Sequence, residues 1–175
     1  MFRLVVVTAA VSLVLVSAFK LEDFPQQYRE LMPEQVKVFI TGLTAQEQAT
    51  MKEVHENFHS YKSDEEVVAA IKAKSPELAA KFENFESWIK GKAAALGPEA
   101  RGYFDTLHEN ARRIRGKFYA GQTPSSAELK QAMLEEITKY KALSSAGKAD
   151  FQKQFPILAG LLTNDEVYKH IQALN

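Results

Sequence analysis

The sequence predicts an all-α fold, built as a single irregular domain of about nine to eleven helices, several of them short. From residue 19 onward Val and Ile are sparse, whereas Ala, Leu, Lys, Glu and Gln, which form helices readily, are abundant. No Asn-Gly or Asp-Gly turn separates two alternating segments, so no β-hairpin is predicted. The 6 prolines are spread along the chain, where each can begin or interrupt a helix. These observations favour many helical segments over a regular bundle.

The first 18 residues form a separate segment that we expect to be removed. Arg3 is its one charged residue, residues 4–16 are an apolar run typical of a signal peptide, and residues 16–18 form a small-residue cleavage site. The predicted division is a signal peptide, 1–18, and a helical domain, 19–175, secreted to the extracellular medium. With 0 cysteines the domain has no disulfide scaffold. The balance of 22 basic and 22 acidic residues argues against nucleic-acid binding.

Capping signals and prolines divide the first part of this domain into helices. Thr44 and Ser63 are each followed three residues later by glutamate, the capping-box pattern of a helix start. The predicted helices span residues 25–32, 33–42, 44–60, 65–74 and 75–96. Helical spacing predicts their inward faces, which are Met51, Val54, Phe58 and Tyr61, then Val67, Val68 and Ile71, then Leu78, Phe82, Phe85, Ile89 and Leu96.

The most regular apolar stripe lies in the second part, over residues 98–119. Its inward positions are Ala100, Phe104, Leu107, Ala111, Ile114 and Phe118. Further helices are predicted over residues 126–144, 147–155, 156–162 and 163–174, with inward Leu129, Met133, Ile137 and Tyr140 in the first and a capping box at Thr163 in the last.

Only a tight corner at residues 96–98 joins the helices at 75–96 and 98–119. Short connections make neighbouring helices pack antiparallel. We therefore expect the two longest stripes to face each other across one apolar space, which brings together Phe82, Phe85 and Ile89 with Phe104, Leu107, Ile114 and Phe118. Trp88 lies on the shoulder of its stripe and should be partly exposed.

The segment His55-Glu-Asn-Phe-His59 matches the pattern H-E-x-x-H, which places two zinc ligands and a general base on one helix face. A further ligand would have to come from Glu77 or Glu83, and charged residues precede the motif. We therefore expect the two histidines to lie in solvent beside the apolar face of a helix, and we expect no bound metal, cofactor or catalytic residue. The recurring Ser/Thr-x-x-Glu segments resemble kinase sites, but their position at helix starts favours capping.

Large apolar side chains are frequent on the predicted inward faces, since the chain contains 11 Phe and 4 Met. Short helices interrupted by Pro and Gly do not pack as a regular four-helix bundle, and irregularly crossing helices leave space between them. Apolar space between helices is a common site for a hydrophobic ligand. The sequence therefore predicts that the domain encloses an apolar ligand cavity.

Several segments, taken in order and at their spacing, resemble one known family. They are Tyr28-Arg-Glu-Leu-Met-Pro-Glu-Gln-Val36, Phe39 with Leu43-Thr44, Lys74-Ser-Pro-Glu-Leu78, and Ile89-Lys-Gly-Lys92 leading to Leu96-Gly-Pro-Glu-Ala100. The sequence is similar to the nematode fatty-acid- and retinol-binding (FAR) proteins over essentially the whole mature chain. The resemblance implies a secreted, non-enzymatic, all-α carrier with an internal cavity for long-chain fatty acids and retinol, which serves lipid acquisition or the sequestration of signalling lipids.

The candidate site is taken from the helical stripes, because the resemblance offers no residue-level binding motif. The residues expected to line the cavity are Phe39, Met51, Val54, Phe58, Val67, Ile71, Phe82, Phe85, Ile89, Phe104, Leu107, Ile114, Phe118, Met133, Ile137, Leu158 and Leu162.

Two cations are candidate anchors for a ligand carboxylate. Arg115 and Lys117 fall about 80° on either side of Leu107 at 100° per residue, so they flank the apolar stripe. Such residues can lay their stems along an apolar wall and keep the charge at the rim. Arg115 is the first choice because its planar fork binds carboxylates bidentately. Arg112 and Arg113 fall on the far face and should be solvated.

Two other functions stay open at this stage. One is an exchangeable lipid-surface protein, for which only residues 98–119 form the long amphipathic helix required. The other is a helical interaction or immune-effector protein with a filled core. The expected partners are small hydrophobic ligands and, during lipid transfer, transiently a membrane, with the protein itself a monomer.

Overall fold

The structure, a computed structural model, describes residues 26–30 and 32–173, so the predicted signal peptide and its cleavage site lie outside it. Every regular element among these residues is a helix, which confirms the all-α class. The elements are α2 (Gln26–Glu30), α3 (Glu34–Thr41), α4 (Ala45–Glu56), the 3-10 helix η2 (Phe58–Ser60), α5 (Asp64–Lys74), α6 (Pro76–Ala94), α7 (Pro98–Tyr119), α8 (Ser126–Ala142), α9 (Ser145–Gln154), α10 (Pro156–Thr163) and α11 (Asp165–Ala173).

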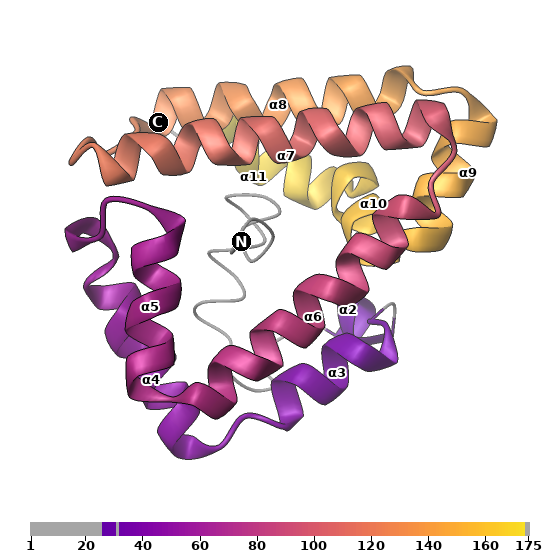
Figure 1. Cartoon of the computed structure of the whole chain (residues 1–175). Coiled ribbons are helices and arrows are strands. Elements are labelled where there is room, and N and C mark those ends of the chain that lie inside the picture. Colours follow the sequence, from indigo (N-terminus) through magenta and orange to yellow (C-terminus); the bar gives the residue numbers. More distant parts are fainter. Residues whose placement is uncertain (1–25, 31, 174–175) are drawn as a thin grey trace.

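The helices lie along three sides of a triangle (Figure 1). On one side α7 and α8 run antiparallel, with α9 at one end and α10 and α11 packed against α8. On the second side α4 and α5 form a pair, and on the third α6 runs with α3 alongside it. The long helix α6 therefore leads from the α4–α5 pair to the beginning of α7.

The predicted antiparallel packing of α6 against α7 is wrong. The two helices meet at the corner around Gly97 and then diverge (Figure 1). A short link holds two helix ends together, but the angle between the axes is set by the faces that each helix covers. Here α8 and α9 cover α7, whereas α3 and α5 cover α6. Asp150 of α9 also accepts a hydrogen bond from the Gly97 amide at 2.7 Å, which ties α9 to this corner.

Most helix starts follow the predicted capping signals. Thr44 and Ser125 each form a reciprocal capping box with the glutamate three residues on. The box predicted at Thr163 is wrong, because Thr163 is still the last residue of α10 and its hydroxyl donates back to a carbonyl of that helix. Asn164 takes its place, and its Oδ1 accepts hydrogen bonds from two amides in the first turn of α11.

The buried apolar side chains fall into separate clusters rather than one continuous core. Cluster A lies around α7 and the C-terminal helices, and its buried members are Ile89, Ala93, Leu96, Ala100, Tyr103, Phe104, Leu107, Ile137, Tyr140, Phe151, Phe155, Leu158, Ala159, Leu162 and Ile171. Cluster B lies around α4, α5 and the first half of α6, with Leu43, Val54, Val67, Ile71, Leu78, Ala79 and Phe82. A small third cluster contains Met32 and Ile40. Because α6 contributes to both A and B, it connects the two.

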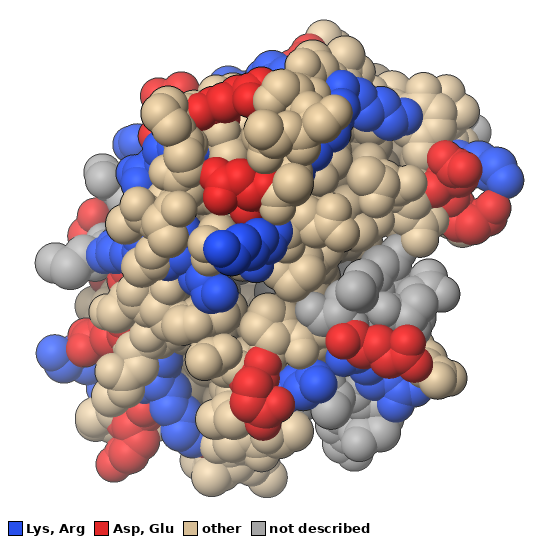
Figure 2. Space-filling view, turned by 90° about the vertical axis from the view of Figure 1, so that its right-hand side faces the viewer, with Lys and Arg blue, Asp and Glu red and all other residues tan. Residues whose placement is uncertain are grey.

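The surface carries charges of both signs. Figure 2 shows acidic and basic side chains interspersed over one face, without a large region of a single sign on that face. Val38 of α3 is a large apolar side chain on the surface, with 59% of its area exposed. Within the described part of the chain, no helix combines the length and the apolar character needed to span a membrane.

Candidate functional site

All of the predicted cavity-lining residues are buried or half-buried. Those that belong to cluster B or pack against it are Phe39, Met51, Val54, Phe58, Val67, Ile71 and Phe82. Those that belong to cluster A or pack against it are Phe85, Ile89, Phe104, Leu107, Met133, Ile137, Leu158 and Leu162. Ile114 and Phe118 lie further along α7, and neither residue is a buried member of cluster A or cluster B. The inward orientation thus agrees with the sequence, while contact with a ligand stays a prediction.

Aromatic contacts along α6 link the two clusters. Phe39 of α3 packs on Phe82 of cluster B with 5.1 Å between the ring centroids, and it stacks on Phe85 at 4.9 Å. Phe85 packs against cluster A and lies 5.4 Å from the ring of Trp88. Trp88 is half-buried, as predicted. The face of α6 that passes between the clusters is therefore lined by aromatic rings.

A second set of rings joins the C-terminal end of α7 to the α4–α5 pair. Phe58 of η2 lies edge-on to Phe118, with 6.4 Å between centroids, and 5.2 Å from Tyr119. All three side chains are half-buried. The stretch of α7 from Ala111 to Phe118 therefore runs from cluster A toward cluster B with apolar side chains turned inward.

The centre of cluster A is an aromatic group that sequence analysis singled out only in part. Phe151 of α9 is fully buried, and its ring lies 5.1 Å from Tyr103, 5.6 Å from Tyr140 and 5.5 Å from Phe155. Burial raises the pKa of both tyrosines, so they stay neutral. Tyr140 is predicted inward, whereas the signal for Phe151 and Phe155 is only their spacing of four in a short helix.

A buried polar group holds α7 against α8. The side-chain amide of Asn110 donates to Oε1 of Glu136, and Nζ of Lys139 lies 3.3 Å from the same oxygen. The Tyr103 hydroxyl donates to the backbone carbonyl of Glu136 at 3.2 Å. These contacts join α7 to α8 and satisfy Oε1 of Glu136, whereas its Oε2 is buried without a hydrogen-bond partner in the described chain.

Arg115 lies deeper than predicted. Only 4% of its side chain is exposed, so its charge is not at a rim. Its Nη2 is 3.4 Å from Oδ2 of Asp64, yet Nε, Nη1 and Nη2 are all buried without a hydrogen-bond partner in the described chain. The prediction of a rim position is wrong because segments distant in sequence lie against α7 here: η2 packs on this helix, and Asp64 at the start of α5 faces Arg115.

Asp64 lies between two side chains of α7. It begins α5, where the helix dipole favours a negative charge. Its Oδ2 faces Arg115, and its Oδ1 accepts a hydrogen bond from the Tyr119 hydroxyl at 2.5 Å. Burial raises the pKa of Tyr119, and the bond to Asp64 raises it further, so the phenol remains a donor. Sequence analysis missed Asp64 because acidic residues in a first helical turn are common.

The other α7 cations are engaged or solvated. Lys117 forms an ion pair with Glu128 of α8, with both side chains partly exposed. Arg112 and Arg113 are exposed, as predicted. The two anchor candidates therefore differ in kind, since Lys117 has a carboxylate partner at the surface whereas the Arg115 guanidinium is buried and under-bonded.

The H-E-x-x-H segment does not lie on one continuous helix. α4 ends at Glu56 and is followed by η2, so the predicted helix to residue 60 is wrong in its last turn. The Asn57 side chain donates to the carbonyl of Glu53 at 2.8 Å where the helix ends. His55 and Glu56 are exposed. Among the described residues no group of three or more His, Cys, Asp or Glu side chains is arranged to hold a metal ion.

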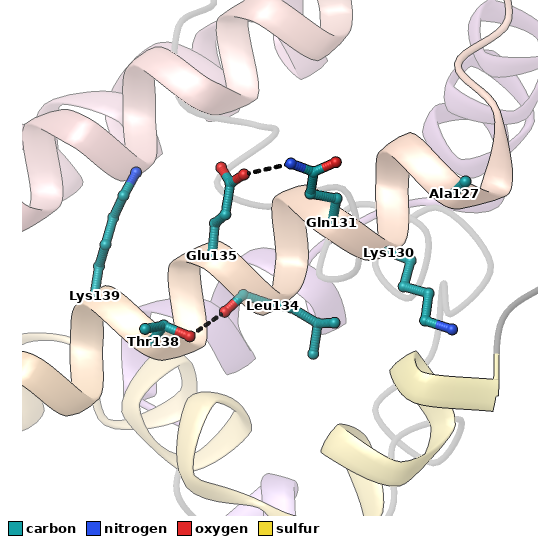
Figure 3. Close-up of a pocket in the computed structure, with 7 residues that line it drawn as sticks. All are labelled: Ala127, Lys130, Gln131, Leu134, Glu135, Thr138 and Lys139. Carbon is teal, nitrogen blue, oxygen red and sulfur yellow. Dashed lines mark hydrogen bonds between the residues drawn. The ribbon is translucent and has the colours of Figure 1, made fainter.

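A surface groove runs along α8 and has a volume of ≈ 570 Å³ (Figure 3). Its lining residues are Ala127, Lys130, Gln131, Leu134, Glu135, Thr138 and Lys139. Gln131 donates to Glu135 at 2.9 Å, while Leu134 points away from both toward the neighbouring helices (Figure 3). Most of the surface exposed in this groove is apolar, but none of the predicted cavity-lining residues lies in it, so it is not the site that the sequence predicts.

Comparison with known proteins identifies the family. The family profile described as "Nematode fatty acid retinoid binding protein (Gp-FAR-1)" matches residues 26–174. The chain belongs to this family. Because the family consists of binding proteins, the chain is a binding protein and not an enzyme.

The similarity to named relatives extends over most of the chain. The chain is 32% identical over 173 residues to fatty-acid and retinol-binding protein 1 of Caenorhabditis elegans, with 95% of each chain covered. It is 34% identical over 146 residues to protein 2 of the same organism, covering 83% of this chain and 80% of the relative. It also shares its fold with the solved Fatty Acid and Retinol binding protein Na-FAR-1 from Necator americanus, at 43% identity and a TM-score of 0.55, covering 89% of this chain and 99% of that one.

Proposed function

We propose that the protein is a secreted, non-enzymatic carrier that binds long-chain fatty acids and retinol in an internal apolar space, for lipid acquisition or sequestration by a nematode. Family membership supports the ligand class, since the relatives are named for these ligands. The apolar run at residues 4–16 and the small residues at 16–18 support secretion.

The observation that carries this proposal is the division of the apolar interior. The buried apolar side chains of a domain usually form one contiguous core with smaller satellite clusters beside it. Here the interior is divided between clusters A and B, which the rings of Phe39, Phe82 and Phe85 link along α6, while α7 passes from one toward the other. Ile114, which belongs to the buried members of neither cluster, is 6% exposed. We place the ligand's hydrocarbon chain along this part of α7, between the two clusters.

The energetics of such a site need no covalent or metal contact. Burying a 16-carbon chain removes about 15 methylene and methyl groups from water, which is worth about 12 kcal/mol at roughly 0.8 kcal/mol each. Lost freedom of the ligand takes back several kcal/mol. The remainder supports micromolar or tighter binding, and because apolar walls discriminate weakly between chain lengths, selectivity among fatty acids should be loose.

A fluorescent fatty-acid titration of the mature protein tests the proposal. A blue-shifted, saturable signal that oleate and retinol displace is expected. Ile114→Lys should abolish it, whereas Val38→Lys, which adds the same charge at an exposed apolar position, should leave it unchanged, with circular dichroism confirming that both variants fold. A signal that appears only with vesicles would indicate a lipid-surface protein instead, and no signal under either condition would indicate an interaction protein with a filled core.

A further inference from the structure

Building on the proposed carrier function, we propose that Arg115 binds the ligand carboxylate and that Asp64 is an internal competitor which occupies the guanidinium until a fatty acid displaces it. The pair would then distinguish acids from alcohols within one apolar site. Four observations support this assignment.

The first is the unmet bonding capacity of Arg115. A guanidinium carries five N–H donors and stays charged at all physiological pH values. In Arg115 all three nitrogens are buried and none donates a hydrogen bond within the described chain. The contact with Asp64, at 3.4 Å, is an ion pair longer than an ordinary charged hydrogen bond. A buried charge in this state is costly, so an anion that supplies two oxygen acceptors at short range is strongly favoured.

The second observation is the position of Arg115 among apolar side chains. Ala111 lies one turn before it and Phe118 one turn after it, so the three share one flank of α7. Ala111 is buried and Phe118 half-buried. A carboxylate on the guanidinium would thus have its hydrocarbon tail directed along the inward stripe, beside Ile114, where the proposed function places the chain.

The third observation is that Asp64 retains other partners when it gives up Arg115. Its Oδ1 keeps the hydrogen bond from Tyr119, and its place in the first turn of α5 keeps the favourable helix dipole. Exchange of one carboxylate for another on Arg115 therefore leaves no unpaired buried charge. The side chain of Asp64 is 17% exposed, so water can reach Oδ2 while Oδ1 keeps the bond from Tyr119.

The fourth observation is that the neighbouring cations do not fit this role. Lys117 is paired with Glu128, and Arg112 and Arg113 are exposed on the opposite face of α7. Retinol carries one hydroxyl and no charge, so it can neither displace Asp64 nor neutralise Arg115. Its affinity should depend on the apolar walls alone.

The test uses three variants of the full mature chain, each titrated with oleate and with retinol after circular dichroism confirms folding. Arg115→Gln should weaken oleate about tenfold or more, the loss of a charged bidentate contact. Asp64→Asn should tighten oleate several-fold because the competitor is removed. Arg112→Gln, a matched change on the solvated face, should alter neither ligand, and retinol should stay within about twofold throughout.

These outcomes separate the anchor from the carrier function itself. If the wild type binds neither ligand, the proposed function fails and the anchor fails with it. If the wild type binds both but Arg115→Gln weakens oleate and retinol equally, or Asp64→Asn leaves oleate unchanged or weaker, the anchor assignment is overturned while the carrier function stands. If Arg115→Gln does not fold, the sign of the Asp64→Asn effect decides.

Discussion

Replacing Phe151 with alanine tests whether cluster A is a packed core. Phe151 is 0% exposed and its ring contacts those of Tyr103, Tyr140 and Phe155. Truncating a buried phenylalanine costs about 3–5 kcal/mol, and loss of several aromatic contacts places this site in the upper part of that range. For a domain of this size each kcal/mol shifts the Tm by about 2–4 °C, so we expect a fall of roughly 10–15 °C.

Urea unfolding monitored by circular dichroism gives the free energy of unfolding for this variant. Its dependence on denaturant concentration should match that of the wild type, because the fold is retained. Phe58→Ala is the matched comparison, since Phe58 is half-buried and should cost clearly less. A loss below about 1 kcal/mol for Phe151→Ala would show that the aromatic group is loosely packed and would refute the reasoning.

Three further predictions concern a helix cap, an acidic transition and the unused metal motif. Asn164→Ala should lower the free energy of unfolding by about 1 kcal/mol, while Thr163→Ala changes it little. A larger loss for Thr163→Ala than for Asn164→Ala would favour the capping box at Thr163 instead. Burial raises the pKa of the Glu47 carboxyl, but hydrogen bonds from Lys81 and Thr44 lower it by more. The pKa is therefore below its ordinary value. That stabilisation is present above the ordinary glutamate pKa and is lost as pH falls through the folded-state pKa. The stability gap between wild type and Glu47→Gln, measured by urea unfolding, should therefore be constant above about pH 5 and narrow below it, and a gap that stays constant in acid would contradict the linkage. After dialysis against Zn²⁺, the protein should hold far less than one equivalent by elemental analysis, and a stoichiometric ion removed by His55→Ala would reverse this conclusion.

Periodicity and capping residues predict the helices well because both act within a few residues of sequence. The stripe of α7 illustrates this, since Phe104, Leu107 and Ile114 are all buried. These local signals do not determine the angle between the axes of two helices. The divergence of α6 and α7 depends on which faces α8, α9 and α5 cover, and these contacts join segments far apart in the chain.

The candidate site shows the same limit for polar residues. Helical spacing correctly places Arg115 beside the apolar stripe, but its depth depends on η2 and on the first residue of α5, which no local pattern positions against α7. Asp64 has an ordinary local explanation as a first-turn acid, so its second role becomes visible only when α5 and α7 are brought together. The solvated positions of Arg112 and Arg113 need no distant partner and are predicted from spacing alone.

In the proposed carrier, the ligand chain lies inside the domain, between clusters A and B. Isotope-filtered NMR of ¹³C-labelled protein with unlabelled oleate measures this directly, because cross-peaks connect ligand protons only to side chains within a few ångström. We predict cross-peaks from the acyl chain to Ile71 of cluster B, Ile89 of cluster A and Ile114 between them. Cross-peaks confined to Ala127 and Leu134 of the α8 groove, or to the exposed Val38, would contradict the claim.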